Sequence, residues 1–187
     1  MHAFEELIAE ILEANGYWVR HSFKVDLTKQ EKVSIGRPSS PRWEIDILAY
    51  RAPENRVLAV ECKSYLDSPG VDLTDLQGGR YATRYKLFTE PQLREVVFQR
   101  LAADLIAKKL CLGQPAIQLA LAAGRLRSDP ARLRTYFDDN GWLLFDPQWV
   151  RAQLEASVDV SYANSVAVMV AKLLLREDKR RELAVPS

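Results

Sequence analysis

Two acidic residues and one lysine fall on two segments that the sequence predicts to be neighbouring strands. Asp46 lies inside one run of mostly apolar residues, and Glu61 and Lys63 end the next run. Residues 52–55 between the runs, Ala-Pro-Glu-Asn, have the composition of a tight turn, which predicts a β-hairpin. A turn centred in this segment places Asp46 opposite Glu61, and residues two apart on a strand share a face. We therefore expect the three charged side chains on one patch.

The remaining hairpin residues are apolar on both predicted faces, as in strands covered on both sides. We place Leu48, Tyr50, Val57 and Ala59 on the face of the charges, and Ile45, Ile47, Ala49, Leu58, Val60 and Cys62 on the other. Unpaired charges in such a sheet cost several kcal/mol, on the order of the effective penalty for a buried ion. The three charged side chains therefore need a partner or a function.

A divalent metal site is one explanation. Neighbouring carboxylates repel each other, and a hard cation that takes oxygen ligands relieves the repulsion. Mg²⁺ fits this description, and we expect Mn²⁺ to substitute for it. Lys63 could then orient an attacking water or stabilise charge on a phosphoryl group. The alternative is structural: an ion pair of Lys63 with Glu61 or Asp46 near the end of the sheet.

The first segment of the chain predicts a helix that could bring another acid to this patch. Apolar residues at positions 4, 7, 8, 11 and 12 have the spacing of an amphipathic helix, and Asn15-Gly16 is typical of its C-terminal end. Glu5 borders the apolar stripe, whereas Glu6 points away from it. We expect Glu5, and not Glu6, to reach the sheet. Residues 17–25 predict the strand that follows.

The order helix, strand, loop, Asp strand, turn, Glu-x-Lys strand resembles the PD-(D/E)xK nuclease superfamily. The closest likeness is to Mrr-type restriction endonucleases and Holliday-junction resolvases. It rests on Glu5, on Asp46 and on Glu61-Cys62-Lys63, and it covers the first third of the chain well. The resemblance implies a DNA endonuclease in which Asp46 and Glu61 bind Mg²⁺, Lys63 is the catalytic lysine and Glu5 supports the metal or the water. It also implies in-line attack on the phosphodiester by a metal-bound water.

Two further positions bear on the resemblance. Ile45 stands before Asp46, where the family name has Pro, although many relatives vary there. Residues 77–81, Gln-Gly-Gly-Arg-Tyr, look like the Gln-x-x-x-Tyr element of RecB-like members. The alternative is that Gln77 and Tyr81 lie on an exposed helix turn without a role.

The formal net charge is only +1, so a nucleic-acid enzyme would need local basic patches. One candidate patch is the polar stretch 24–42, which we expect to be a mobile loop, with Lys24, Lys29, Lys32, Arg37 and Arg42. A second is Arg80, Arg84 and Lys86, interleaved with Tyr81 and Tyr85, where cations could bind phosphates and rings could stack on bases. The alternative for both is ordinary solvated surface. DNA is the expected partner, and the sequence does not exclude RNA.

Composition fits a globular protein, with 187 residues and 48% hydrophobic content. Cys62 and Cys111 form no metal-binding or disulfide pattern, so we expect a reducing, cytoplasmic location. No segment predicts export or membrane insertion. The sequence does not decide between a monomer and a homodimer.

The second half of the chain predicts the rest of an α/β fold. Helices are expected at 91–112, from 129–130 to 140–141, from 146–147 to about 155 and from about 162 to 181, with strands at 116–122 and 142–145. The expected fold is one restriction-endonuclease-like domain over residues 1–187, with a mixed sheet of about five strands and helices on both faces, in the order αβββαβαβαα. Two other functions stay open: a non-catalytic nucleic-acid-binding or assembly module with this fold, and a structural protein with a buried salt-bridge cluster.

Overall fold

The computed structural model describes the backbone of residues 3–159 and 165–183, and the side chains of these as far as residue 175. The chain forms two compact units, Met1–Asp146 and Pro147–Ser187. The first unit holds the whole sheet and all the residues predicted to form a site. The second holds the helices α7 (Pro147–Ser157) and α8 (Val166–Leu183). The predicted start of the last helix near residue 162 lies outside the described residues.

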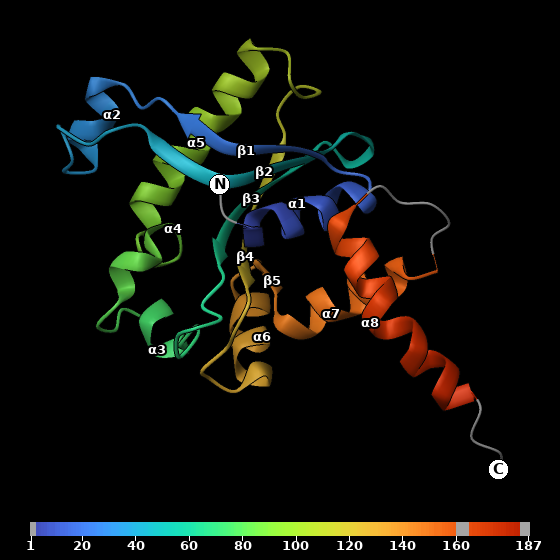
Figure 1. Cartoon of the computed structure of the whole chain (residues 1–187). Helices are drawn as coiled ribbons and strands as arrows, with labels where there is room; N and C mark the ends of the chain where they lie inside the picture. Colours follow the sequence, from blue (N-terminus) through green and yellow to red (C-terminus); the bar gives the residue numbers. More distant parts are fainter. Residues whose placement is uncertain (1–2, 160–164, 184–187) are drawn as a thin grey trace. The chain divides into compact units, whose positions relative to one another are not determined.

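A five-stranded mixed sheet forms the centre of the first unit, as predicted (Figure 1). Its strands are β1 (Trp18–Val25), β2 (Trp43–Arg51), β3 (Arg56–Lys63), β4 (Ala116–Ala123) and β5 (Leu143–Phe145), in the spatial order β1-β2-β3-β4-β5. The first three strands are antiparallel neighbours, whereas β3, β4 and β5 are parallel. The hairpin strands β2 and β3 therefore lie inside the sheet.

The helices of the first unit are distributed over both faces of this sheet. They are α1 (Ala3–Ala14), α2 (Lys29–Ser34), α3 (Leu73–Leu76), α4 (Lys86–Thr89), α5 (Pro91–Ala107) and α6 (Pro130–Asp139), with the single 3₁₀ turns η1 (Ala52–Glu54) and η2 (Ala82–Arg84). Helix α1 contacts β1, β2 and β3. Apolar residues of α5 and α6 pack in a separate large cluster with Leu48, Val57 and Leu119 of the sheet. The longer elements follow the predicted order.

Helix α5 ends earlier than predicted. It stops at Ala107 instead of continuing to residue 112, and Lys109 has a positive φ of 54°. The amide groups of Lys108 and Leu110 donate hydrogen bonds to carbonyl groups of the last turn. These bonds satisfy carbonyl groups that the end of the helix leaves free, so the chain can turn away before Gly113.

The predicted hairpin register is confirmed. Ile47 pairs with Val60 and Leu48 with Ala59. The turn is η1 followed by Asn55, which adopts a left-handed conformation with φ 43° and ψ 44°. Asn tolerates this conformation better than most residues. The paired ladder ends at Ile47 and Val60, so Asp46 and Glu61 lie just beyond it.

The predicted alternation of β2 is wrong at one point. Ile45 packs in the same cluster as Leu48, and Ile47 is not part of that cluster. The irregularity coincides with Ser22 of β1, which has a positive φ of 47° and makes no ladder pair with Asp46. A residue in this conformation changes the local twist of a strand. The chain therefore departs from regular strand geometry at Asp46.

The segment 24–42 is also more ordered than the predicted loop. Thr28 and Glu31 form a capping box at the start of α2, in which each side chain satisfies a free backbone amide group. The Glu31 carboxylate also accepts hydrogen bonds from Arg100 of α5, with Nη2 at 2.8 Å from Oε1. This contact ties the segment to α5.

Among the described residues, no helix has the length and apolar character needed to cross a membrane.

Gly124 offers a test of how tightly the end of β3 is held. Its amide group donates to the Lys63 carbonyl oxygen at 2.9 Å, and a Cβ at this position would overlap the Ser64 carbonyl oxygen. We expect Gly124→Ala to lower the free energy of unfolding by about 1–3 kcal/mol, as for other overpacked sites. Urea unfolding followed by circular dichroism measures the change. A loss below about 0.5 kcal/mol, the range of neutral surface changes, would contradict this packing.

Candidate active site

Lys63 and Glu61 form an ion pair at the end of β3. Lys63 Nζ lies 2.8 Å from Glu61 Oε1, and the two side chains are only 21% and 18% exposed. Burial raises the pKa of Glu61, while the charge of Lys63 opposes that rise. Burial would lower the pKa of Lys63, but Glu61 and then Asp46 raise it above its ordinary value. The lysine is therefore kept as a cation beside two acidic groups.

Asp46 occupies the gap beyond the β2–β3 ladder. Its Oδ2 accepts a hydrogen bond from the Cys62 amide group at 2.8 Å. Burial raises the pKa of the Asp46 carboxyl, against the opposing effects of this hydrogen bond and of Lys63. The negative charges of Glu5 and Glu44 raise it further. The structure thus brings Asp46 into electrostatic contact with the other predicted site residues.

Both acids of α1 reach the sheet, so the prediction that Glu6 points away from it is wrong. Glu5 acts electrostatically on both Asp46 and Cys62. Glu6 instead has its Oε2 3.8 Å from His21 Nε2. Burial, and then Asp46 and Glu5, raise the pKa of the Cys62 thiol, so this cysteine stays neutral and is a poor nucleophile. The Cys62 thiol therefore does not have the properties of a reactive cysteine.

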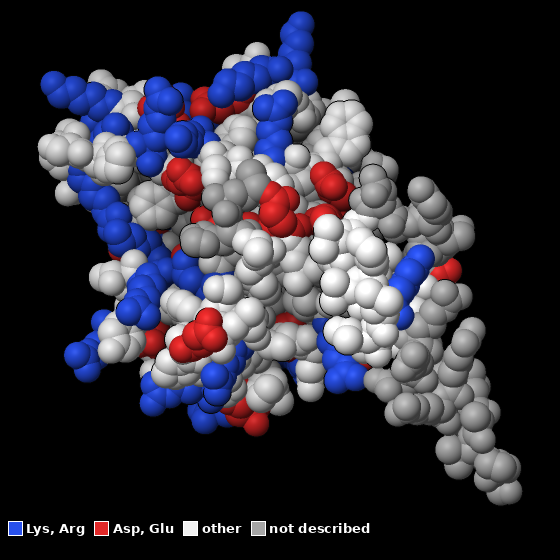
Figure 2. Space-filling view, in the orientation of Figure 1, with Lys and Arg blue, Asp and Glu red and all other residues white. Residues whose placement is uncertain are grey.

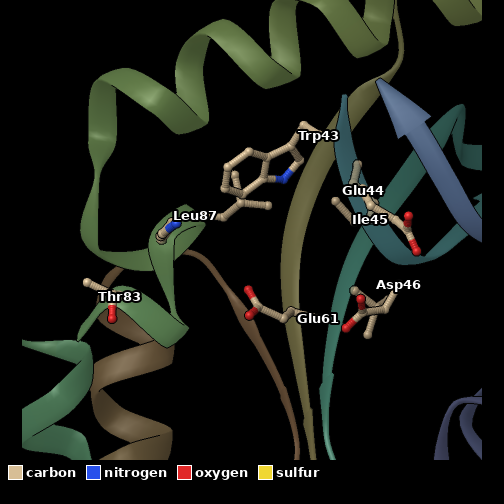
Figure 3. A pocket seen from close by; sticks show the side chains of 10 residues that line it. Trp43, Glu44, Ile45, Asp46, Glu61, Thr83 and Leu87 are labelled. Atoms are coloured by element: carbon tan, nitrogen blue, oxygen red, sulfur yellow. The ribbon is translucent and has the colours of Figure 1, made fainter. Parts of the chain in front are cut away.

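A cavity of about 140 Å³ opens beside these acids (Figure 3). Its lining residues are Trp43, Glu44, Ile45, Asp46, Ala59, Val60, Glu61, Thr83, Lys86 and Leu87. Figure 3 shows Asp46 and Glu61 on neighbouring strands, with Thr83 and Leu87 across the cavity and the Trp43 ring at another side. The sequence did not predict Trp43 or Thr83 as site residues. Nothing local marks them, because the wall forms only when η2 and α4 pack near the sheet.

The donor set fits a hard divalent cation such as Mg²⁺. One oxygen of each acid is engaged, Asp46 Oδ2 with Cys62 and Glu61 Oε1 with Lys63. The second oxygen of each has no hydrogen-bond partner among the described residues. In the described part of the chain, no group of three or more His, Cys, Asp or Glu side chains is arranged to hold a metal. Mg²⁺ commonly takes only one or two protein carboxylates, with waters and substrate phosphates completing its shell.

The cations predicted in segment 24–42 differ in what they contact. Arg37 Nη2 lies 2.6 Å from Glu90 Oε2, and Arg42 Nε lies 3.1 Å from Asp26 Oδ2. Both arginines are therefore partly neutralised. Lys29 is exposed and Lys32 half-buried on α2. Figure 2 shows Lys and Arg side chains over the part of this view that carries α2 and α4, with acids nearer the middle.

Gln77 and Tyr81 are both exposed, but they do not share a helix turn. Helix α3 ends at Leu76 and η2 begins at Ala82, so the alternative is right that both residues are exposed but wrong that they lie on one helix turn. The guanidinium carbons of Arg80 and Arg84 lie 5.3 and 4.5 Å from the centre of the Tyr81 ring. Gly78, with a φ of 97°, breaks the helical path between them.

Tyr85 cannot stack on nucleic-acid bases as predicted, because its side chain is only 1% exposed. Its ring belongs to the large apolar cluster. Its hydroxyl group is hydrogen-bonded to Tyr65, and burial together with this bond raises the pKa of Tyr85. The tyrosine therefore links the segment before α4 to the segment after β3.

Comparison with known proteins gives little further information. No protein-family model matches the chain, and a search of curated proteins also finds no match. The chain is similar to a crystal structure described as "Protein of Unknown Function AF1548", with a TM-score of 0.48 and 16% sequence identity over 97% of this chain and 88% of that one.

The raised pKa of Asp46 gives a pH-dependent stability test. A carboxyl group with a higher pKa in the folded than in the unfolded protein stabilises the fold at acidic pH, and this contribution is lost as the pH rises through the folded-state value. Asp46→Asn removes the ionisation and keeps a side-chain oxygen for the Cys62 amide group. In EDTA, we expect the melting temperature of this variant, relative to wild type, to increase from about pH 4 to about pH 7.

Asp139→Asn, on an exposed position of α6, controls for the change in net charge. The structural alternative makes a different prediction, because breaking a buried ion pair costs about 3–5 kcal/mol. A loss of that size for Asp46→Asn at neutral pH would identify the cluster as structural.

Proposed function

We propose that this protein is a divalent-metal-dependent endonuclease that hydrolyses phosphodiester bonds in DNA. The observation that carries the proposal is the second carboxylate oxygen of Asp46 and of Glu61, which has no hydrogen-bond partner among the described residues. Both acids lie next to the cationic Lys63, at the wall of one cavity. A structural salt bridge accounts for Lys63 and Glu61. It does not account for a third charged group, Asp46, held beside them with a raised pKa.

In this proposal Asp46 and Glu61 hold Mg²⁺. The bound ion would neutralise the acids, polarise the phosphodiester and lower the pKa of a coordinated water. The protein supplies the positions. The Cys62 amide group fixes the Asp46 carboxylate, and Glu61 fixes the Lys63 ammonium group at 2.8 Å. Preorganised groups of this kind act without reorganisation when charge develops on the phosphoryl oxygens.

In this proposal, Lys63 stabilises the negative charge that develops in the transition state. During in-line hydrolysis, water attacks phosphorus while the bond to the leaving oxygen breaks, and negative charge spreads over the phosphoryl oxygens. An ammonium group that remains protonated can stabilise this charge. The raised pKa of Lys63 keeps it protonated at neutral pH.

A module that binds nucleic acid without cutting it is the competing function. The complete set of Asp46, Glu61 and Lys63 argues against it, because loss of chemistry usually shows first as a lost acid or lysine. Two free cysteines support a cytoplasmic location within the proposal. RNA is the alternative substrate, to be compared with DNA in the same assays.

The first test of the proposal removes either a proposed metal ligand, Asp46, or the positive charge of Lys63. We expect Asp46→Ala and Lys63→Ala each to reduce Mg²⁺-dependent cutting of DNA by at least about 100-fold, the loss typical when one stabilising group is removed. Plasmid nicking and linearisation measure the activity, and circular dichroism checks that each variant is folded. If the wild type cuts and either variant cuts equally well, the assignment is wrong.

Metal substitution belongs in the same assay. Mn²⁺ should replace Mg²⁺, whereas Ca²⁺ should support binding without efficient cutting, because it is larger and tolerates looser geometry. Calorimetry that detects no divalent binding, with and without DNA, would count against the enzyme.

The second test uses the two neighbouring acids of α1 as a matched pair. Glu5→Gln removes a negative charge that acts on Asp46, whereas Glu6→Gln removes one that lies near His21. We expect the first change to weaken the Mg²⁺ dependence or the rate by about 10- to 100-fold, as for outer-shell partners of metal ligands. The second should leave both unchanged. Equal, wild-type-like Mg²⁺ titrations for the two variants would remove Glu5 from the site.

A further inference from the structure

The cavity beside the acids has two chemically different parts. Trp43, Ile45, Ala59, Val60 and Leu87 supply apolar surface, and Glu44, Asp46, Glu61, Thr83 and Lys86 supply polar groups. A free metal ion or an inorganic phosphate would need no apolar wall. Ligand pockets with a few polar groups on an apolar lining hold molecules that have both characters. The cavity therefore suits a ligand with an anionic group and a flat or apolar part.

Lys86 is the cation of this cavity that is free to meet an anion. Lys63 is already paired with Glu61. Lys86 is half-buried and forms no ion pair with any described acidic side chain. It lies close enough to Glu61 to lower the pKa of that acid, against the larger effect of burial. By contrast, the predicted phosphate ligands Arg37 and Arg42 have acidic partners.

Contacts of Leu87 and Tyr85 with other parts of the domain hold the segment that carries Lys86 in place. Arg94 Nη1 donates to the Leu87 carbonyl oxygen at 2.8 Å, and its guanidinium carbon lies 5.1 Å from the centre of the Trp142 ring. Tyr85, directly before Lys86, is buried and hydrogen-bonded to Tyr65. The wall opposite the acids is therefore anchored on both sides of Lys86. Anchored groups lose less conformational freedom when a ligand binds.

Trp43 supplies an aromatic surface on another side of the same cavity. Its ring packs against the apolar cluster and also lines the cavity. Figure 3 shows the indole ring above the Glu61 carboxylate, near Leu87. Aromatic side chains bind unpaired bases by stacking, with little dependence on sequence. A base inside a duplex is already stacked on both sides and cannot lie against such a wall without leaving the helix.

We propose that the cavity takes one unpaired nucleotide of the substrate strand, with its phosphate at Lys86 and Thr83 and its base against Trp43. The inference rests on the proposed nuclease function and narrows its substrate to DNA with single-stranded or unpaired segments. The volume of about 140 Å³ is about the size of one base and excludes a duplex, so the sugar of the nucleotide would lie at the open side of the cavity. The same placement sets the phosphodiester next to Asp46 and Glu61.

Binding is measured separately from cutting to test this inference. A fluorescently labelled single-stranded oligonucleotide and a blunt duplex of the same sequence are titrated with protein in Ca²⁺, and anisotropy reports the dissociation constant. The variants are Lys86→Met, which removes the charge and keeps most of the length of the side chain, Trp43→Ala and Trp43→Phe. Lys109→Met, at an exposed position after α5, is the control. Thermal unfolding checks each variant.

We expect wild type to prefer the single strand, and Lys86→Met and Trp43→Ala each to weaken its binding roughly tenfold. Lys86→Met should also reduce the slope of log affinity against log salt by about 0.7, because one phosphate contact is lost. Trp43→Ala should leave that slope unchanged. Trp43→Phe should retain most of the affinity, because it keeps an aromatic ring. Lys86→Met keeps the inference testable if Trp43→Ala is unstable.

The outcomes separate the two proposals. If single-strand binding depends on Lys86 and Trp43 but wild type cuts nothing in Mg²⁺, the nucleotide site stands and the nuclease function fails. If Asp46-dependent cutting is present but Lys86→Met and Trp43→Ala both bind and cut as wild type does, the inference is overturned and the nuclease function stands. Equal affinity for single strand and duplex, or no binding to either, also overturns the inference.

Discussion

The site depends on where the β2–β3 ladder ends. Up to Ile47 and Val60 the two strands exchange backbone hydrogen bonds, and one residue further the Asp46 carboxylate takes the Cys62 amide group instead. A buried amide group must find a partner, and a side-chain acceptor here satisfies it while allowing the strands to separate. The Asp46 carboxylate is thereby held between the strands, beside the end of β3.

This arrangement concentrates negative charge in a partly buried place. Glu5, Glu44 and Glu61 all lie close enough to Asp46 to act on it or be acted on by it, and Lys63 compensates only part of their charge. Burial and mutual repulsion raise the pKa values of Asp46 and Glu61. Sites with such opposed demands on charge are often functional, because a fold selected for stability alone would avoid them. A bound cation would relieve the same repulsion.

Packing decides which of the basic residues are paired with acids and which are available to a ligand. The sequence of segment 24–42 predicts free cations, yet α2 is capped by Thr28 and Glu31 and tied to α5 through Arg100. Arg37 is paired with Glu90, which lies 53 positions away in sequence. Lys86, in contrast, lines the cavity without an ion-pair partner among the described residues. Because ion-pair partners can lie far apart in sequence, the sequence alone does not show which charges are neutralised and which can contact a ligand.

The sequence by itself determined the features that depend on local periodicity. The length of the turn at Pro53 and the alternation of the strands specified the pairing of Ile47 with Val60, because antiparallel register follows from the turn. Helical spacing likewise indicated that Glu5 lies near Asp46, but it did not predict that Glu6 lies beside His21 of β1. Local signals also gave the order of the longer elements, since caps and apolar periods belong to single segments.

The tertiary structure decided what depends on contacts between distant segments. In the folded protein, Ile45 packs in the same cluster as Leu48, and Tyr85 is buried. Trp43 and Lys86 line one cavity. None of these follows from spacing, because the packing of α4 and α5 on the sheet selects them. The partners of a side chain depend on the packing of the whole domain. A local sequence pattern reports only the preference of one segment, which tertiary packing can override.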